Sequence, residues 1–188
     1  MRRKDDEKQR NIKEAVIKLI LKEGFHGTSI SKIAREAGVS PATVYIYYEN
    51  KEVMLQDIYK EYSEDIFECL LDKIDDCTSG KELIEILVTE YYLYIRDNSE
   101  IFHFVDQFAS CPALSNQCSS KTGMRIFNNF LDTMKRRGIF KNFRNDNLMA
   151  ILFYPIKSIA INSCIDEDEK PELLDELIEI IEDALLIK

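Results

Sequence analysis

A tight turn between two short apolar repeats, within residues 28–51, constrains the fold more than any other part of the sequence. A serine or threonine can cap a first helix, which ends at Gly38. Ser40 can cap a second helix, with Pro41 at its favoured first position. Two short helices joined by a glycine-containing turn have the spacing of a helix-turn-helix. The inner side of this unit is expected to contain six residues, with Val39 in the turn and Val44 and Tyr48 placed by a helical wheel: Ile30, Ile33, Ala34, Val39, Val44 and Tyr48.

The residues of the second helix that face outward carry groups that suit contact with DNA. Ala42 is small enough for close approach, and the hydroxyls of Thr43 and Tyr45 can reach phosphates or base edges. Apolar groups such as Ala42 and Ile46 can contact thymine methyl groups. The Tyr47 hydroxyl lies at the margin of this face, where a phosphate oxygen is the expected partner. The pattern therefore predicts a helix that lies in a DNA groove.

A phosphate site is also expected where the next helix begins. Asn50 can cap that helix and Lys51 follows in its first turn, so backbone amides and an ammonium group come together. Residues 1–51 contain 11 Lys and Arg against 7 Asp and Glu, whereas residues 52–188 contain 14 against 27. A basic head on an acidic body explains how a chain with a net charge of −9 can bind nucleic acid.

The remainder of the chain has helical periodicity and few helix breakers, with six Gly and four Pro in 188 residues. A first helix is expected from about Lys4 to Glu23, and a long helix from Lys51 to about Cys77. Five more are expected at residues 79–97, 99–110, 115–137, 146–165 and 171–187. The prediction is an all-α fold of about nine helices. Its domains are a helix-turn-helix DNA-binding domain at 1–50 and a helical regulatory and dimerisation domain at 51–188.

After an apolar first helix, the chain contains the runs G-F-x-x-T-S-I, I-A-x-x-A-G-V-S and T-V-Y-x-Y-Y-x-N-K-E. Residues 11–58 thereby resemble the DNA-binding domain of TetR/AcrR-type transcriptional regulators. Relatives often carry Lys-Gly where Pro41 and Ala42 stand, so a possible guanine-reading cation is missing and contacts should be more apolar. The resemblance implies backbone contacts to double-stranded DNA from Thr28, Thr43, Tyr47 and Lys51, and base-proximal roles for Ser40, Pro41, Ala42 and Tyr45.

The resemblance also implies what the body does. Its members form homodimers through the last two helices, here residues 146–187, whose apolar surface exceeds what one monomer's core needs. We therefore expect a repressor that leaves its palindromic operator when an unknown small-molecule effector binds. Aromatic residues at helical spacing are more often core than pocket, but the resemblance favours a pocket among the middle helices. The candidate ligand-binding residues are Tyr91, Phe102, His103, Asp106, Phe127, Phe130 and Phe153.

Other functions have less support in the sequence. The chain has two histidines, no glycine-rich phosphate loop and no metal-ligand spacing, so we expect no catalytic residue, no cofactor and no metal site. Two alternatives stay open: a helical protein–protein adaptor with a degenerate DNA-binding head, and a redox-responsive regulator acting through Cys111 and Cys118. No run of 18 apolar residues is present, and no apolar segment follows the basic start. A cytoplasmic protein without a membrane partner is expected.

Overall fold

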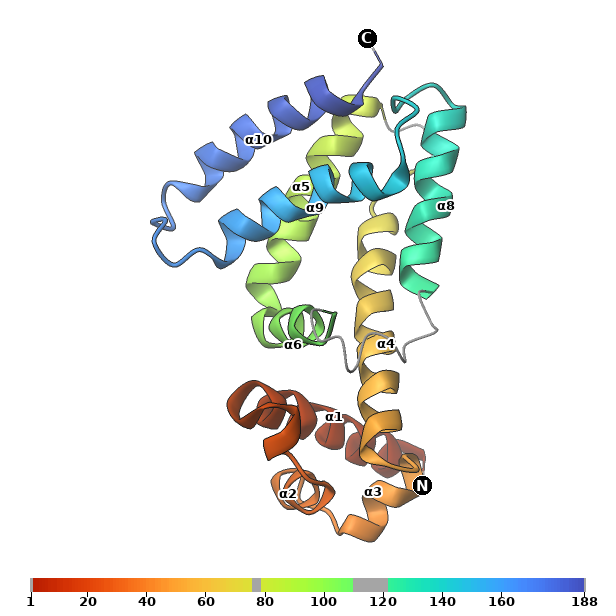
Figure 1. Ribbon diagram of the computed structural model, residues 1–188, viewed down its shortest axis with the longest axis vertical. Helices are drawn as coiled ribbons and strands as arrows, with labels where there is room; N and C mark the ends of the chain where they lie inside the picture. Colours follow the sequence, from red (N-terminus) through yellow and green to blue (C-terminus); the bar gives the residue numbers. More distant parts are fainter. Residues whose placement is uncertain (1, 76–78, 110–121, 188) are drawn as a thin grey trace. The chain divides into compact units, whose positions relative to one another are not determined.

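Nine α-helices run through the residues that the structure, a computed structural model, describes, namely 2–75, 79–109 and 122–187 (Figure 1). They are α1 (Arg2–Gly27), α2 (Ile30–Glu36), α3 (Pro41–Tyr47), α4 (Lys51–Leu71), α5 (Gly80–Asp97), α6 (Ser99–Ala109), α8 (Thr122–Arg136), α9 (Asn145–Ile161) and α10 (Lys170–Leu185). In these ranges the β-structure is limited to one isolated bridge, between Phe140 and Leu186. The prediction of an all-α fold is confirmed. Within the described ranges, no helix combines the length and apolar character needed to cross a membrane.

The chain divides into two compact units, which are described separately. Unit 1 comprises Met1–Ser63 and Glu100–Lys121, and unit 2 comprises Glu64–Ser99 and Thr122–Lys188. The division falls within α4, between Ser63 and Glu64. Unit 1 therefore contains the expected DNA-binding head, the first part of α4, and α6. The predicted boundary at residue 50 would instead assign α4 and α6 to the second domain.

The core of unit 1 is built on the apolar stripe of α1. Phe104 and Phe108 of α6 belong to the same core, and the Phe108 ring stacks on Tyr59 of α4 with 4.3 Å between centroids. Burying an aliphatic or aromatic side chain of this size contributes about 1.5–3 kcal/mol. The side chains that α1, α2 and α3 bury here include Ile12, Ala15, Val16, Leu19, Ile20, Ile33, Ala34 and Val44.

α1 continues further than its sequence suggests. Gly24 has a φ of 71°, which breaks the helical geometry at the residue where we expected the helix to stop. A short helical segment nevertheless follows, and the element ends at Gly27. α4 differs in the opposite sense, because it ends at Leu71 rather than near Cys77, and Lys73 and Ile74 lie in turns that close on Leu70 and Leu71.

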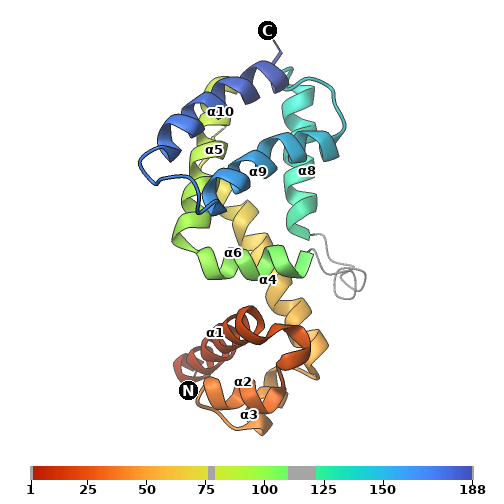
Figure 2. The same cartoon turned by 60° about the vertical axis from the view of Figure 1, so that its left-hand side comes forward.

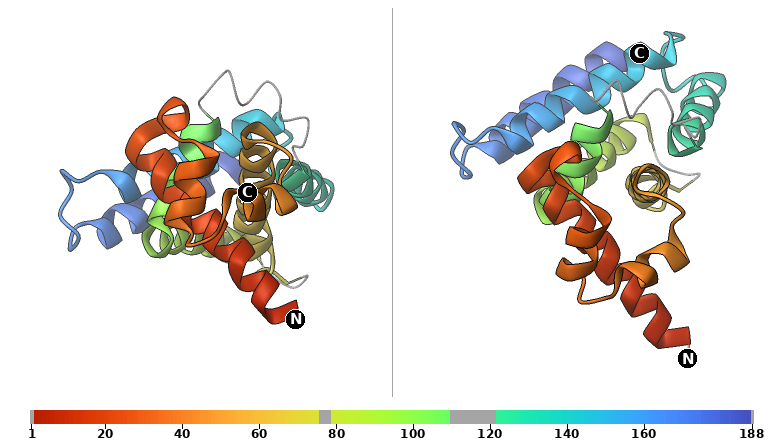
Figure 3. Two further views of the ribbon diagram at one scale, coloured as in Figure 1. Left: turned by 90° about the horizontal axis from the view of Figure 1, so that it is seen from below. Right: turned by 60° about the horizontal axis from the view of Figure 1, so that its bottom comes forward.

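In unit 2, α5, α9 and α10 pack against one another and α8 packs against α9. α9 and α10 run side by side in opposite directions (Figure 3). Lys170, at the start of α10, is buried, and its ammonium donates to Ala160 O in the last turn of α9 at 3.2 Å and to Glu167 at 2.5 Å. These bonds tie the two helices together at their connection.

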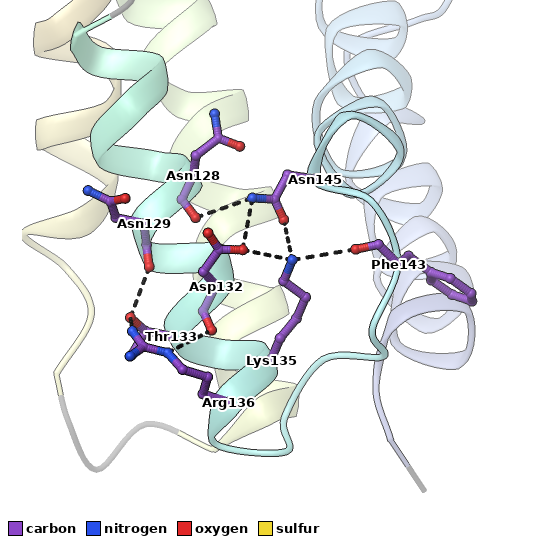
Figure 4. A network of polar contacts seen from close by, with 8 residues as sticks. All are labelled: Asn128, Asn129, Asp132, Thr133, Lys135, Arg136, Phe143 and Asn145. Atoms are coloured by element: carbon purple, nitrogen blue, oxygen red, sulfur yellow. Dashed lines mark hydrogen bonds and ion pairs between the residues drawn. The ribbon is translucent and has the colours of Figure 1, made fainter.

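A polar network joins α8 to the start of α9 (Figure 4). The Lys135 ammonium lies 2.7 Å from Asp132 Oδ1 and donates to Asn145 Oδ1 at 2.7 Å. The Asn145 amide donates to Asp132 Oδ1 at 3.1 Å and to Asn128 O at 3.4 Å. The hydrogen bond from the Lys135 ammonium lowers the pKa of the Asp132 carboxyl most strongly. The hydrogen bond from the Asn145 amide lowers it further.

Candidate nucleic-acid interface

The turn between α2 and α3 is closed by the residues that the sequence pattern indicates. Ser29 caps α2, since its hydroxyl oxygen accepts from Lys32 N at 3.3 Å. Gly38 has a φ of 66°, and Val39 N then donates to Ala34 O at 2.9 Å. α2 and α3 are therefore joined by a short, hydrogen-bonded turn (Figure 2).

Ser40 fixes the start of α3. Its hydroxyl oxygen accepts from Thr43 N at 3.1 Å and lies 2.9 Å from Thr43 Oγ1, and Pro41 is the first helical residue. Val44 and Tyr48 are buried beneath the helix, and Tyr48 N donates to Val44 O at 3.0 Å. The helix is thus held by its inner side, and its opposite side is free of the core.

We call Pro41, Ala42, Tyr45 and Ile46 the outer face of α3. All four side chains are exposed, and Tyr45 and Ile46 keep 56% and 77% of their area accessible. Exposed large apolar side chains on a short helix are not explained by packing within unit 1. An α-helix fits the major groove of B-DNA, where such groups can contact thymine methyl groups. The outer face is therefore an exposed, mainly apolar helix surface that the core of unit 1 leaves uncovered.

Two predicted backbone contacts have partners within unit 1. Thr28 is buried, and its hydroxyl donates to Gly24 O at 2.9 Å. The Lys51 ammonium donates to Phe25 O at 3.0 Å and to Thr28 O at 3.1 Å, and it lies 4.0 Å from the centroid of the Phe25 ring. Both side chains therefore hold the end of α1 in place, a role that the sequence pattern did not indicate.

Tyr47 is held by the first turn of α1. Its hydroxyl donates to the Asp5 carboxylate and lies 3.3 Å from Asp5 O. The hydrogen bond to Asp5 raises the pKa of the Tyr47 hydroxyl to about 12, and desolvation of the phenol makes the second largest contribution to this rise. At neutral pH the phenol is protonated, as in any tyrosine, and its hydrogen is directed to Asp5. Sequence reasoning missed this contact, because the two residues are 42 positions apart.

Comparison with known proteins agrees with this geometry. The family described as "Bacterial regulatory proteins, tetR family" matches residues 12–58, which contain α2, α3 and the outer face. A TetR family transcription regulator from Marinobacter aquaeolei VT8 is 25% identical, with a TM-score of 0.80 over 100% of both chains. An uncharacterized HTH-type transcriptional regulator of Haemophilus influenzae is 26% identical over 182 residues, which are 95% of this chain and 96% of that protein. The chain is a TetR-type transcriptional regulator.

Two further similarities concern fatty-acid regulators. The fatty acid metabolism regulator protein of Bacillus subtilis is 31% identical over 85 residues, which are 45% of this TetR-type chain and 44% of that protein. This match thus spans less than half of its relative. The structure of the transcriptional regulator FadR from Bacillus subtilis, in complex with stearoyl-CoA, has a TM-score of 0.70 at 20% identity and covers 92% of this chain and 96% of that one. At this identity the second similarity shows the fold alone.

The candidate ligand-binding residues of the TetR-type body fall into two groups. Phe102, His103 and Asp106 lie on α6 in unit 1, where Phe102 is buried and His103 exposed. The others, in unit 2, form an aromatic cluster with ring centroids 4.8 Å apart for Tyr91–Phe153, 5.1 Å for Phe127–Phe153 and 5.4 Å for Phe127–Phe130. Phe67 of α4, which the sequence did not single out, contacts Phe127 and Phe153 at 5.3 and 5.8 Å.

Unit 2 of the regulator also contains a cavity of about 440 Å³ beside Phe130. Its lining is mostly apolar, with Thr133, Asp75 and Arg137 as the polar groups. Leu71, Ile74, Leu83 and Met134 complete it. Two of the five cysteines, Cys69 and Cys164, are free and exposed. The predicted redox pair Cys111 and Cys118 lies outside the described residues.

Proposed function

We propose that this TetR-type regulator is a homodimeric repressor whose α3 helices read a palindromic operator. The exposure of Tyr45 and Ile46 on a capped helix with a buried inner side supports this proposal most directly. Ser40, Pro41, Ala42 and Tyr45 would lie next to base edges, and Thr43 and Tyr47 would contact phosphates. Two of the three ammonium hydrogens of Lys51 bond to carbonyls, which leaves one for a phosphate oxygen. Thr28, whose hydroxyl is buried, would contribute through the main chain at the start of α2.

Operator selection from random-sequence DNA, followed by mobility-shift measurements, tests this proposal. We expect Tyr45→Ala to weaken operator binding about tenfold or more, since each good base contact contributes about 1–3 kcal/mol. Phe143→Ala removes an exposed aromatic residue from unit 2 and is the matched control, for which we expect unchanged binding. Equal affinities for the two variants would remove α3 from the interface, and failure to select any sequence would favour a protein–protein adaptor.

The proposed dimer would form through α9 and α10. Tyr154 on α9 and Ile180 on α10 keep 69% and 62% of their area accessible in the single chain, and Ile161 at the end of α9 is also exposed. Apolar groups of this size on two adjacent helices suit a second copy of the chain. Such a dimer can place two α3 helices about 34–36 Å apart, one turn of DNA. Sedimentation of the wild type should show a dimer. The double variant Tyr154→Asp, Ile180→Asp should sediment as a monomer, whereas the control Phe143→Asp should remain a dimer.

The effector that we propose is a long-chain acyl-CoA, by analogy with the FadR structure that holds stearoyl-CoA. The mostly apolar lining of the cavity beside Phe130 supports contact with the acyl chain of such a ligand. Stearoyl-CoA should raise the melting temperature and release the operator, whereas CoA alone should do neither. If every acyl chain length fails in both assays, the acyl-CoA proposal is wrong, while DNA recognition is unaffected.

A cytoplasmic location follows from the proposed DNA target. The relatives are transcriptional regulators, and a regulatory rather than an enzymatic role is proposed for this chain as well.

A further inference from the structure

The Tyr47 hydroxyl has a partner at the position where DNA would need it. A phenol carries one hydrogen, so it can donate to only one acceptor at a time. In unit 1 that acceptor is the Asp5 carboxylate, in the first turn of α1, with Asp5 O as a second neighbour at 3.3 Å. A phosphate oxygen would require the same hydrogen.

The charge next to Tyr47 also opposes a phosphate. Asp5 and Asp6 are both exposed, and both raise the pKa of the Tyr47 hydroxyl, Asp5 mainly through its hydrogen bond. A carboxylate that accepts from the phenol takes the place of the phosphate anion, and the two negative groups repel each other. The N-terminal turn of α1 therefore competes with DNA for one of the proposed backbone contacts.

We propose that Asp5 is an internal competitor of the operator: its carboxylate masks Tyr47 in the free protein and must release the hydroxyl before Tyr47 can donate to a phosphate. This inference rests on the proposed function, since it takes Tyr47 to be a DNA contact. The Asp5 carboxylate would thereby keep the operator affinity of the wild type below that of the same DNA-binding head without this carboxylate.

A double-mutant cycle on operator affinity tests the proposal. Asp5→Asn should bind the selected operator about three- to tenfold more tightly than the wild type, because the hydroxyl no longer has to leave a charged acceptor. Glu7→Gln removes the same charge from the neighbouring exposed stretch without touching Tyr47 and is the matched control. In a Tyr47→Phe background, Asp5→Asn should gain no more than Glu7→Gln does.

The competitor role would be overturned by equal gains for Asp5→Asn and Glu7→Gln, by unchanged binding in Asp5→Asn, or by a full Asp5→Asn gain that persists in Tyr47→Phe. Weaker binding by Asp5→Asn would show that Asp5 positions Tyr47 instead of masking it. A DNA-free measurement checks the contact itself. In an ultraviolet titration against Tyr47→Phe, Asp5→Asn should bring the pKa of Tyr47 down from about 12 toward 10, and an unchanged value would exclude the bond. If the wild type selects no operator, the proposed function itself fails. If it selects an operator that Asp5→Asn binds with unchanged affinity, only the competitor role of Asp5 fails.

Discussion

Lys51 shows how one side chain can serve the fold at a position expected to serve DNA. Its ammonium donates to the carbonyls of Phe25 and Thr28 and lies over the Phe25 ring, so it closes the end of α1 against the start of α4. The sequence pattern predicted a phosphate site at Lys51, whereas the two carbonyls that its ammonium contacts come from residues 23 and 26 positions away. Spacing along the sequence does not show such partners.

We predict that Lys51→Met lowers the free energy of unfolding by about 1–3 kcal/mol, since two half-buried carbonyls lose their donor. Lys18→Met is the control, because Lys18 pairs with Glu36 on the exposed surface and should change the value by less than about 1 kcal/mol. Urea unfolding of both variants measures the difference. Similar values for the two variants would show that the Lys51 bonds contribute little.

At the scale of elements, the turn between α2 and α3 depends on one backbone conformation. Gly38 has a φ of 66°, and no atom lies within 4 Å of the position that a Cβ would occupy. Gly38→Ala should therefore cost about 1–2 kcal/mol of unfolding free energy through backbone strain alone. Gly38→Asn should cost less, because asparagine tolerates this conformation better. Thermal unfolding followed by circular dichroism measures both, and an alanine variant as stable as the wild type would contradict the strain argument.

The link between α8 and α9 should depend on pH. The pKa of Asp132 is lowered in the folded state by Lys135 and Asn145, so the link stabilises the fold above the ordinary aspartate pKa. This contribution is lost as the pH falls through the lowered pKa. Asp132→Asn should therefore melt below the wild type at pH 7, and the gap should close below about pH 4. A gap of constant size across this range would exclude the carboxylate as its source.

The elements themselves follow well from local sequence signals. Ser40 with Pro41 predicted the start of α3, and the helical wheel separated the buried Val44 from the exposed Ile46, because caps and periodicity act over a few residues. Contacts across the chain were not predictable in this way. The inclusion of α6 in the core of unit 1, through Phe104 and Phe108, and the burial of Lys170 depend on tertiary packing.

For the whole molecule, the uneven charge predicts how DNA binding responds to salt. The basic first 51 residues would meet the phosphates, and the acidic remainder of the chain would take no part. The logarithm of the association constant should fall linearly with the logarithm of salt concentration, because bound phosphates release their counterions. Affinity that is independent of salt would argue against the proposed contacts from Thr43, Tyr47 and Lys51.

The central claim, that the outer face of α3 reads bases, is tested most directly by the specificity ratio of an Ile46 variant. The ratio compares affinity for the selected operator with affinity for a scrambled duplex, at several salt concentrations. We predict that Ile46→Ala lowers this ratio about fivefold or more and leaves the salt slope unchanged, because base contacts specify while phosphate contacts set the slope. An unchanged ratio in Ile46→Ala and in Tyr45→Ala would contradict the claim.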